Sequence, residues 1–245
     1  MLVAIYNAWD HELLRQSVDN ILKAVDKVII VYSNHSNKGE KLRFPVEQFA
    51  DCSLIQHEPD LGLIPHKNEQ NKRNAGLRFA QEIGANYFIM LDGDEFYQPE
   101  DVRFWYEYLR HSSLSGLVCR SHVYFGKPTL TIGEDTTYVP FIHKIVPGLK
   151  FVFTQDYPYT RHEGKLRIDP TRRLNITANV RLIGCIMHHY SYLRKDIDQK
   201  INNSSAESLK KVADVIKNDL KNAEKGYFCQ YYGKELIEAP NLFNL

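Results

Sequence analysis

Three carboxylates stand within four positions of this sequence, at Asp92, Asp94 and Glu95, directly after the apolar run 87–91. Like charges this close raise one another's energy, so a compensating partner is expected beside them. Carboxylate oxygens are the ligands that Mg²⁺ and Mn²⁺ prefer, and such ions keep coordination positions open for substrate phosphates. Gly93 lets the backbone turn between the two aspartates without a side-chain clash. The spacing therefore predicts a divalent metal site.

A solvated acidic turn, or the cap of a following helix, is the alternative interpretation. An isolated pair of aspartates arises often by chance in a chain with 30 acidic residues. Its position after a buried strand favours the metal site. An EF-hand is excluded, because Phe96 and Tyr97 stand where that loop needs an oxygen ligand and a glycine. A haloacid-dehalogenase type of phosphatase is also excluded, since its aspartates follow the first strand of the fold.

The composition is that of an ordinary soluble domain, with 43% hydrophobic and 25% charged residues in a chain of 245. The net charge of +1 excludes a general attraction to nucleic acid or anionic membranes. No two cysteines are spaced for a zinc site or a disulfide framework, so free thiols are expected. The cysteines are Cys52, Cys119, Cys185 and Cys229.

No apolar run approaches 18 residues, so no integral membrane segment is expected. The N-terminal stretch "MLVAIYNAWDHE" lacks the basic region of a signal peptide and is interpreted as a first core strand. These features predict a cytoplasmic protein.

The first half alternates between strand and helix patterns. Apolar, β-branched runs predict strands over 2–7, 27–33, 52–58 and 86–92. Apolar residues at helical spacing predict helices over 9–25 and 67–83. This alternation indicates an α/β fold, a Rossmann-like and mostly parallel sheet sandwiched by helices.

The second half is less regular. A helix is expected over 101–112, strands over 116–125 and within 181–192, and a helix over 206–223. The region 129–169 is rich in aromatic residues, proline and glycine, and predicts short strands and loops.

Polar residues follow several of the predicted strands. Tyr6 and Asn7 end the first strand, Ser33 and Asn34 the second, and Asp92 the fourth. In parallel sheets, ligands bind beyond the carboxyl ends of the strands, so these residues are expected to line one crevice.

The segment 71–97, "NKRNAGLRFAQEIGANYFIMLDGDEFY", strongly resembles family-2-like glycosyltransferases of the GT-A fold. Tyr6 and Asn7 fit the same family, and the resemblance is looser after residue 97. It implies one GT-A domain over 1–192, with a nucleotide-sugar-binding half (1–97) and an acceptor-side half (98–192). Residues 193–245 are then a C-terminal helical extension.

The resemblance also implies roles for single residues. Asp94 and Asp92 would hold Mn²⁺ or Mg²⁺ at the diphosphate of a nucleotide sugar, with Gly93 beside it, and Glu95 would support or cap them. Arg73 and Asn74 would lie near the nucleotide.

Tyr6 and Asn7 would lie against the base of a donor for which a UDP-sugar is favoured. The family usually carries an acidic pair after its second strand, but this chain has Tyr32 and Ser33 there. Asp60 or the amide of Asn34 would then replace that acid.

Two motifs in the second half resemble a subset of the family. "YTRHEGK" (159–165) makes Glu163 the candidate general base, and "IMHHYSYLR" (186–194) makes His189, or its neighbour His188, a third metal ligand or phosphate contact. A base is needed to take the proton of the attacking hydroxyl. A surface salt bridge is the alternative role of Glu163, and its rivals as the base are Asp135, Asp156 and Asp169.

The leading hypothesis is a metal-dependent glycosyltransferase that moves a sugar, with inversion, to an acceptor hydroxyl of a glycan, a protein or a modified nucleic acid. A sugar nucleotidyltransferase is one alternative, although "YNAWDHE" lacks the glycine-rich loop that such enzymes carry after the first strand. A non-catalytic relative that binds a glycan or a partner is another. The oligomeric state is left open.

Overall fold

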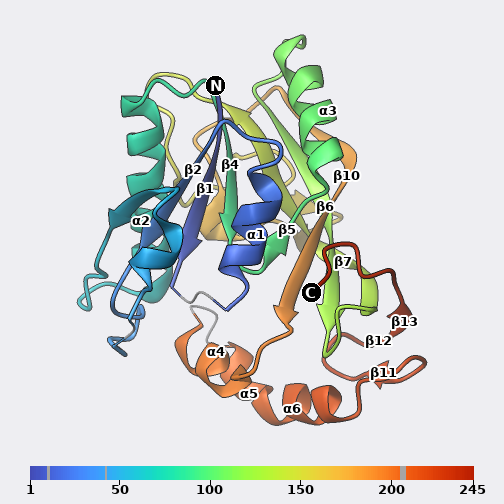
Figure 1. Cartoon of the computed structure of the whole chain (residues 1–245). Coiled ribbons are helices and arrows are strands. Elements are labelled where there is room, and N and C mark those ends of the chain that lie inside the picture. Colours follow the sequence, from blue (N-terminus) through green and yellow to red (C-terminus); the bar gives the residue numbers. More distant parts are fainter. Residues whose placement is uncertain (10–11, 42, 205–207) are drawn as a thin grey trace.

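One mixed sheet runs through the computed structural model, which describes residues 1–9, 12–41, 43–204 and 208–245 (Figure 1). Its strands are β1 (Leu2–Ala8), β2 (Lys27–Tyr32), β3 (Ser53–Gln56), β4 (Tyr87–Asp92), β5 (Glu95–Phe96), β6 (Gly116–Phe125), β7 (Leu130–Lys144), β10 (Val180–Tyr192) and β13 (Ile237–Glu238). The strand order is β3-β2-β1-β4-β7-β6-β10-β5, and β13 pairs with β7. The predicted α/β fold class is confirmed.

Three helices cover the parallel part of this sheet. They are α1 (Leu14–Ile21), α2 (Pro65–Glu82) and α3 (Pro99–Arg110). All of β1 is buried, as expected of a strand that is covered on both faces. Its alternate side chains enter two cores. Leu2 and Ala4 belong to the core that includes residues of α1 and α3, whereas Val3 and Ile5 belong to the core that includes residues of α2.

The register of the parallel strands brings three strand ends together. β1 pairs in parallel with both β2 and β4, so Asn7 lies opposite Asp92 and Ala8 lies opposite Tyr32. The strand order reverses at β1, which makes its carboxyl end the topological switch point of the sheet. These ends point toward the C-terminal helices (Figure 1). The prediction that they lie close together is confirmed.

Two predicted segments differ from the structure. β7 is one strand of 15 residues, where short strands and loops were expected. Its sequence is interrupted by Gly133 and Pro140, but antiparallel pairing with β4 and β6, which includes register shifts, holds it extended. The helix expected over 9–25 is confirmed only as the shorter α1; residues 10 and 11 lie outside the described part of the chain.

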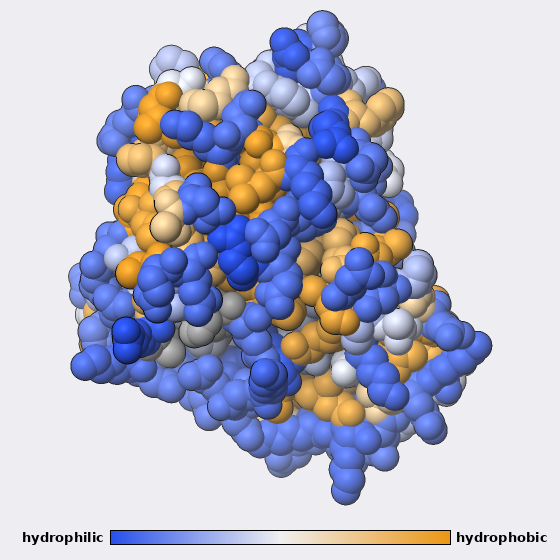
Figure 2. All heavy atoms as spheres, in the orientation of Figure 1, coloured by the Kyte–Doolittle hydropathy of each residue, from blue (hydrophilic) through white to orange (hydrophobic). Residues whose placement is uncertain are grey.

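The C-terminal segment closes the end of the sheet that the parallel strands face. Its helices are α4 (Ile197–Asn203), α5 (Ser208–Lys211) and α6 (Ala213–Lys221), and β11 (Phe228–Cys229) pairs with β12 (Lys234–Glu235). Ile201 and Ile216 pack with Val123 and Phe125 of β6, while the lower edge in Figure 2 is mostly hydrophilic, with some hydrophobic atoms exposed. The helix expected over 206–223 is present as two helices, α5 and α6. Residues 206 and 207 are outside the described ranges.

Shorter elements complete the chain: η1 (Val46–Phe49), η2 (Pro170–Arg172), and the hairpin of β8 (Arg161–His162) with β9 (Lys165–Leu166). All four cysteines are free, as predicted. Among the described residues, no helix has both the length and the apolar character needed to cross a membrane.

Gly76 of α2 offers a test of how closely this helix packs on the sheet. A Cβ atom there would lie 2.5 Å from Ile5 Cγ2 and 2.8 Å from Val31 Cγ2. We expect Gly76→Ala to lower the free energy of unfolding by about 1–3 kcal/mol, because overpacking outweighs the helix propensity of alanine. Urea unfolding measures this. Gly184→Ala is the control, since no heavy atom lies within 4 Å of its added Cβ. Equal stability of the two variants would contradict the prediction.

Candidate active site

A cavity of about 420 Å³ lies beyond the carboxyl ends of β1, β2 and β4. The strand ends, α2, the residue before η2, the end of β10 and the C-terminal helices all contribute to its wall. The wall includes the side chains of Asn7, Trp9, Ser33, Lys72, Asp92, Asp94, Asp169, His189, Arg194 and Lys200.

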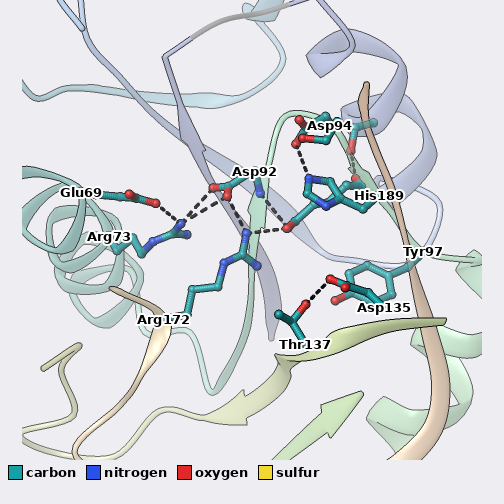
Figure 3. A network of polar contacts seen from close by, with 12 residues as sticks. Glu69, Arg73, Asp92, Asp94, Tyr97, Asp135, Thr137, Arg172 and His189 are labelled. Carbon is teal, nitrogen blue, oxygen red and sulfur yellow. Dashed lines mark hydrogen bonds and ion pairs between the residues drawn. The ribbon is translucent and has the colours of Figure 1, made fainter. Parts of the chain in front are cut away.

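The acidic cluster of Asp92, Asp94 and Glu95 is neutralised by cations from distant parts of the chain. Arg172 Nη2 donates to both Asp92 Oδ2 and Glu95 Oε1, each at 2.5 Å. Glu95 Oε2 in turn accepts the backbone N–H of Asp92 at 2.9 Å, which closes a ring of contacts. Arg73 lies on the other side of Asp92, with its Nη2 3.3 Å from Oδ2 (Figure 3). Glu95 therefore fastens the turn, as expected of a supporting residue.

The pKa values of these acids follow from burial and from the arginines. Burial raises the pKa of Asp92, but Arg172 and Arg73 outweigh it and lower the value to about 2. Glu95 is 2% exposed, and burial keeps its pKa above the usual value in spite of Arg172. The two carboxylates share one guanidinium, and the more deeply placed of them binds a proton more readily.

Asp94 has a separate set of partners from β10, from α4 and from the segment between them. Its Oδ2 accepts hydrogen bonds from Arg194 Nη2 at 2.5 Å and Lys200 Nζ at 3.1 Å. Its Oδ1 faces His189 Nε2 at 3.5 Å. Burial raises the pKa of Asp94, but Lys200, Arg194 and His189 together hold it well below the usual range. Asp94 is therefore a carboxylate at neutral pH.

Two oxygens of the cluster suit a divalent cation. Asp92 Oδ1 is buried and accepts no hydrogen bond, although Arg73 Nη2 lies 3.2 Å away. Asp94 Oδ1 and the imidazole of His189 face each other. Oxygen and imidazole donors suit Mn²⁺. In the described ranges, no three His, Cys, Asp or Glu side chains are grouped closely enough to hold a metal as they stand. The donors fit the ion in type, with His189 and not His188 beside Asp94.

His188 points to the opposite face of β10. Its Nδ1 pairs with Tyr124 Oη at 2.9 Å, and its ring packs against Phe243. Burial lowers the pKa of His188 to about 4, so the ring is neutral. Because successive residues of a strand face opposite sides, only one of the two histidines can reach Asp94. The alternative that assigned the metal to His188 is not supported by this arrangement.

Lys72 lies in the part of the cavity next to Ser33. Its ammonium donates to the Ala8 carbonyl at 2.5 Å and to Ser33 Oγ at 2.7 Å, so it ties the end of β1 to the end of β2. Lys72 is 5% exposed, and burial lowers its pKa to about 7. A cation thus lies beside Ser33, one of the two residues that stand where the family usually carries an acidic pair.

Several predicted contacts of the nucleotide lie elsewhere. Tyr6 is fully buried, and its hydroxyl pairs with Ser17 Oγ of α1 at 2.7 Å, so it faces away from the cavity. The side-chain amide of Asn74 donates a hydrogen bond to the backbone carbonyl of Phe151 and accepts one from its backbone N–H. Asp60 caps a turn by accepting the N–H of Gly62. These three residues have structural partners instead.

Asn34, the other suggested replacement, donates its backbone N–H to Glu58. Arg73 forms ion pairs with both Asp92 and Glu69 (Figure 3). Of the predicted nucleotide contacts, the structure brings Asn7, Ser33, Asp92 and Gly93 to the cavity.

The candidate bases are widely separated. Glu163 forms the tip of the β8–β9 hairpin with φ +50°, and its side chain is 75% exposed and outside the cavity wall. Asp135 accepts bonds from Thr136 and Thr137 beside the cavity, and Asp156 bonds Thr154.

Asp169, one of the rivals of Glu163, does line the cavity. Its Oδ1 accepts the N–H of Thr171 at 2.6 Å, which caps η2, and its side chain is exposed to solvent.

Sequence reasoning missed Trp9, Lys72, Arg172 and Lys200. Trp9 carried a signal, as an aromatic residue just beyond a strand that ends at the crevice. Arg172 and Lys200 carried none, because only the tertiary fold brings them to Asp92 and Asp94.

The comparison with known families agrees with this geometry. The sequence model of glycosyl transferase family 2 matches residues 1–201. The chain belongs to this family. The resemblance drawn from residues 71–97 is thereby confirmed. No curated protein sequence matches this family 2 chain.

Solved structures similar in fold include S. aureus TarS 1–349, at 13% identity and a TM-score of 0.47, over 91% of this chain and 71% of that one. The UDP complex of TarS 1–349 is matched at 14% identity and a TM-score of 0.39, over 51% of this chain and 37% of that one. Glucosyl-3-phosphoglycerate synthase from Mycobacterium tuberculosis, in complex with Mn²⁺, UDP-glucose and phosphoglyceric acid, is matched at 12% identity and a TM-score of 0.33, over 50% and 43%. The family 2 chain thus spans little more than a third of the TarS chain in the UDP complex.

Arg172 should be essential to the stability of the family 2 chain. We expect Arg172→Met to lower the free energy of unfolding by about 3–5 kcal/mol, because it leaves the buried Glu95 carboxylate without its cation. Arg15→Met is the control, since Arg15 pairs with the exposed Asp19 and Asp51 and should contribute no more than about 1 kcal/mol. Urea denaturation compares the two. Similar losses of stability in both variants would show that the contacts among Arg172, Asp92 and Glu95 are not a main source of the stability of the fold.

Proposed function

We propose that the protein transfers a sugar, with inversion, from a nucleotide-diphosphate sugar to a hydroxyl of a glycan, a protein or a modified nucleic acid. The observation that carries this proposal is one cavity at the switch point of the sheet, whose wall includes the Asp92–Asp94 motif and the cations Arg194 and Lys200 that contact Asp94. Membership of glycosyl transferase family 2 supports it. A UDP-sugar is the favoured donor.

The diphosphate is proposed to bind beside Asp94, next to Arg194, which follows β10, and Lys200 of α4. Arg194 and Lys200 both line the cavity and reach Asp94 Oδ2, so a diphosphate beside Asp94 would lie within their reach. Cations fixed at this position stabilise the negative charge that develops on the leaving group. The nucleoside would extend over β1 and β2, where Asn7, Trp9 and Ser33 line the cavity.

Asp94 and His189, with Asp92 Oδ1, are the residues proposed to hold Mn²⁺ or Mg²⁺. A bound divalent ion would neutralise charge on the diphosphate as the sugar departs. Before that, Arg194 and Lys200 keep Asp94 ionised and therefore ready to act as a ligand.

Asp169 is proposed as the general base in place of Glu163. Its carboxylate would take the proton of the acceptor hydroxyl as the oxygen attacks the anomeric carbon. The bond from that carbon to the diphosphate breaks at the same time, and the nucleoside diphosphate leaves with the electron pair. The cap contact with Thr171 holds one oxygen and fixes the orientation of the carboxylate.

Asp94→Asn tests the role of the acidic motif. We expect transfer to be abolished, and the increase in melting temperature caused by a UDP-sugar with Mn²⁺ to be lost, because a ligand stabilises only the protein that binds it. The wild type should show this increase only with metal. Asp214→Asn, an exposed acid on α6, is the control and should behave as wild type. Unchanged transfer by Asp94→Asn would refute the proposed metal-dependent mechanism.

Asp169→Asn tests the assignment of the base. We expect kcat to fall by roughly 10²- to 10⁴-fold, the usual contribution of a general base, with an unchanged Kd for UDP. Glu163→Gln is the matched comparison, and its kcat should stay near that of the wild type because its side chain faces solvent. Steady-state kinetics and calorimetry separate the two effects. The reverse pattern would return the role of base to Glu163.

A further inference from the structure

Lys72 stands apart from the other cations of the cavity. Its ammonium lies between the ends of β1 and β2, whereas Arg194 and Lys200 lie at Asp94, beyond the end of β4. Because the strand order is β2-β1-β4, these two groups of cations occupy opposite sides of β1. One cavity therefore has a positive group at each end.

The two ends of the cavity suit different parts of a nucleotide. The Asp94 end offers several cations and is suited to a diphosphate. The Lys72 end has the aromatic Trp9 and the polar Asn7 and Ser33, which suit a flat heterocycle with polar edges. A nucleotide laid across the switch point with its phosphates at Asp94 would place its base over Lys72.

We propose that Lys72 determines base specificity, by donating a hydrogen bond to the exocyclic carbonyl of a keto base such as uracil or guanine. This inference rests on the proposed function, since it assumes that a nucleotide occupies the cavity. The acid that the family usually places after its second strand accepts hydrogen bonds from a base. Lys72 and Ser33 reverse that polarity at the corresponding place.

The hydrogen-bonding state of Lys72 supports this role. An ammonium has three donors, and among the described residues its acceptors are the Ala8 carbonyl and Ser33 Oγ, which use two of them. A buried ammonium is unfavourable unless its donors are satisfied. Burial lowers its pKa to about 7, because the ammonium has lost most of its contact with water. A carbonyl oxygen of a bound base would supply a third acceptor.

The same contact would reject amino bases. Cytosine and adenine carry an NH₂ group where uracil and guanine carry a carbonyl oxygen. If this NH₂ group faced Lys72, two hydrogen-bond donors would meet, and both would be left without an acceptor in a place with little water. Such a mismatch weakens binding strongly. The size of the base is not read by this contact, so the distinction is keto against amino, not pyrimidine against purine.

Two pairs of ligands isolate this contact, because each differs mainly at the exocyclic group: UDP against CDP, and IDP against ADP. Calorimetry at about pH 6, below the pKa of Lys72, would measure their Kd values with Mn²⁺ present. For the wild type we expect the keto member of each pair to bind roughly 10- to 100-fold more tightly. In Lys72→Met both ratios should fall to about threefold or less, since the side chain keeps its length but loses its donor.

Two further variants serve as comparisons. Lys67→Met removes an α2 lysine that packs on Phe153 outside the cavity wall, and it should keep both ratios. Ser33→Ala removes one acceptor of the ammonium but leaves the ammonium, so it should also keep a keto preference. Urea denaturation would confirm that each variant is folded.

Three outcomes overturn the inference. Unchanged ratios in Lys72→Met would show that another group reads the base. An equal loss for all four nucleotides would place the ammonium at the phosphates instead. If no nucleotide binds the wild type, the proposed function fails as well, which distinguishes that result from the first two.

Discussion

The neutralisation of three adjoining carboxylates is the constraint on which this site depends. Asp94 and Glu95 are 3% and 2% exposed, so their charges cannot be left to solvent. The fold meets this requirement with guanidinium and ammonium groups from η2, from the segment that follows β10, and from α4. The same contacts join the two halves of the chain. The arrangement of the proposed site and the stability of the fold therefore depend on one set of ion pairs, and replacing a member of the set is expected to change both.

The sequence predicts that a bound metal ion compensates this cluster. In the structure, the acids are already partnered by side chains, and those cations are the groups that a diphosphate would also attract. Binding of the proposed donor would then be an exchange of partners, in which arginine and lysine shift part of their interaction from carboxylate to phosphate. Such an exchange keeps the buried charges compensated before and after binding.

The parts of the fold that local patterns determine were predictable. The apolar run of β4 and the helical spacing of α2 are strong local signals, and both elements lie within two residues of their predicted bounds. β7 was not predictable, because glycine, proline and polar residues interrupt its pattern and pairing with two neighbours keeps it extended. Glu163 was favoured over Asp169 by a motif, but only the tertiary fold shows that one lies on a hairpin tip and the other at the cavity.

The partners of the acidic cluster come late in the chain. Arg172 lies 80 residues after Asp92, and Lys200 lies 106 residues after Asp94. During synthesis on the ribosome, the strands that carry the acids emerge well before the cations that neutralise them. The acidic side chains of the nascent sheet therefore lack these partners until η2 and α4 follow. Completion of the proposed active site is therefore a late event in biosynthesis. A chain that ends before η2 would contain the acidic cluster without Arg172, Arg194 and Lys200, which neutralise it.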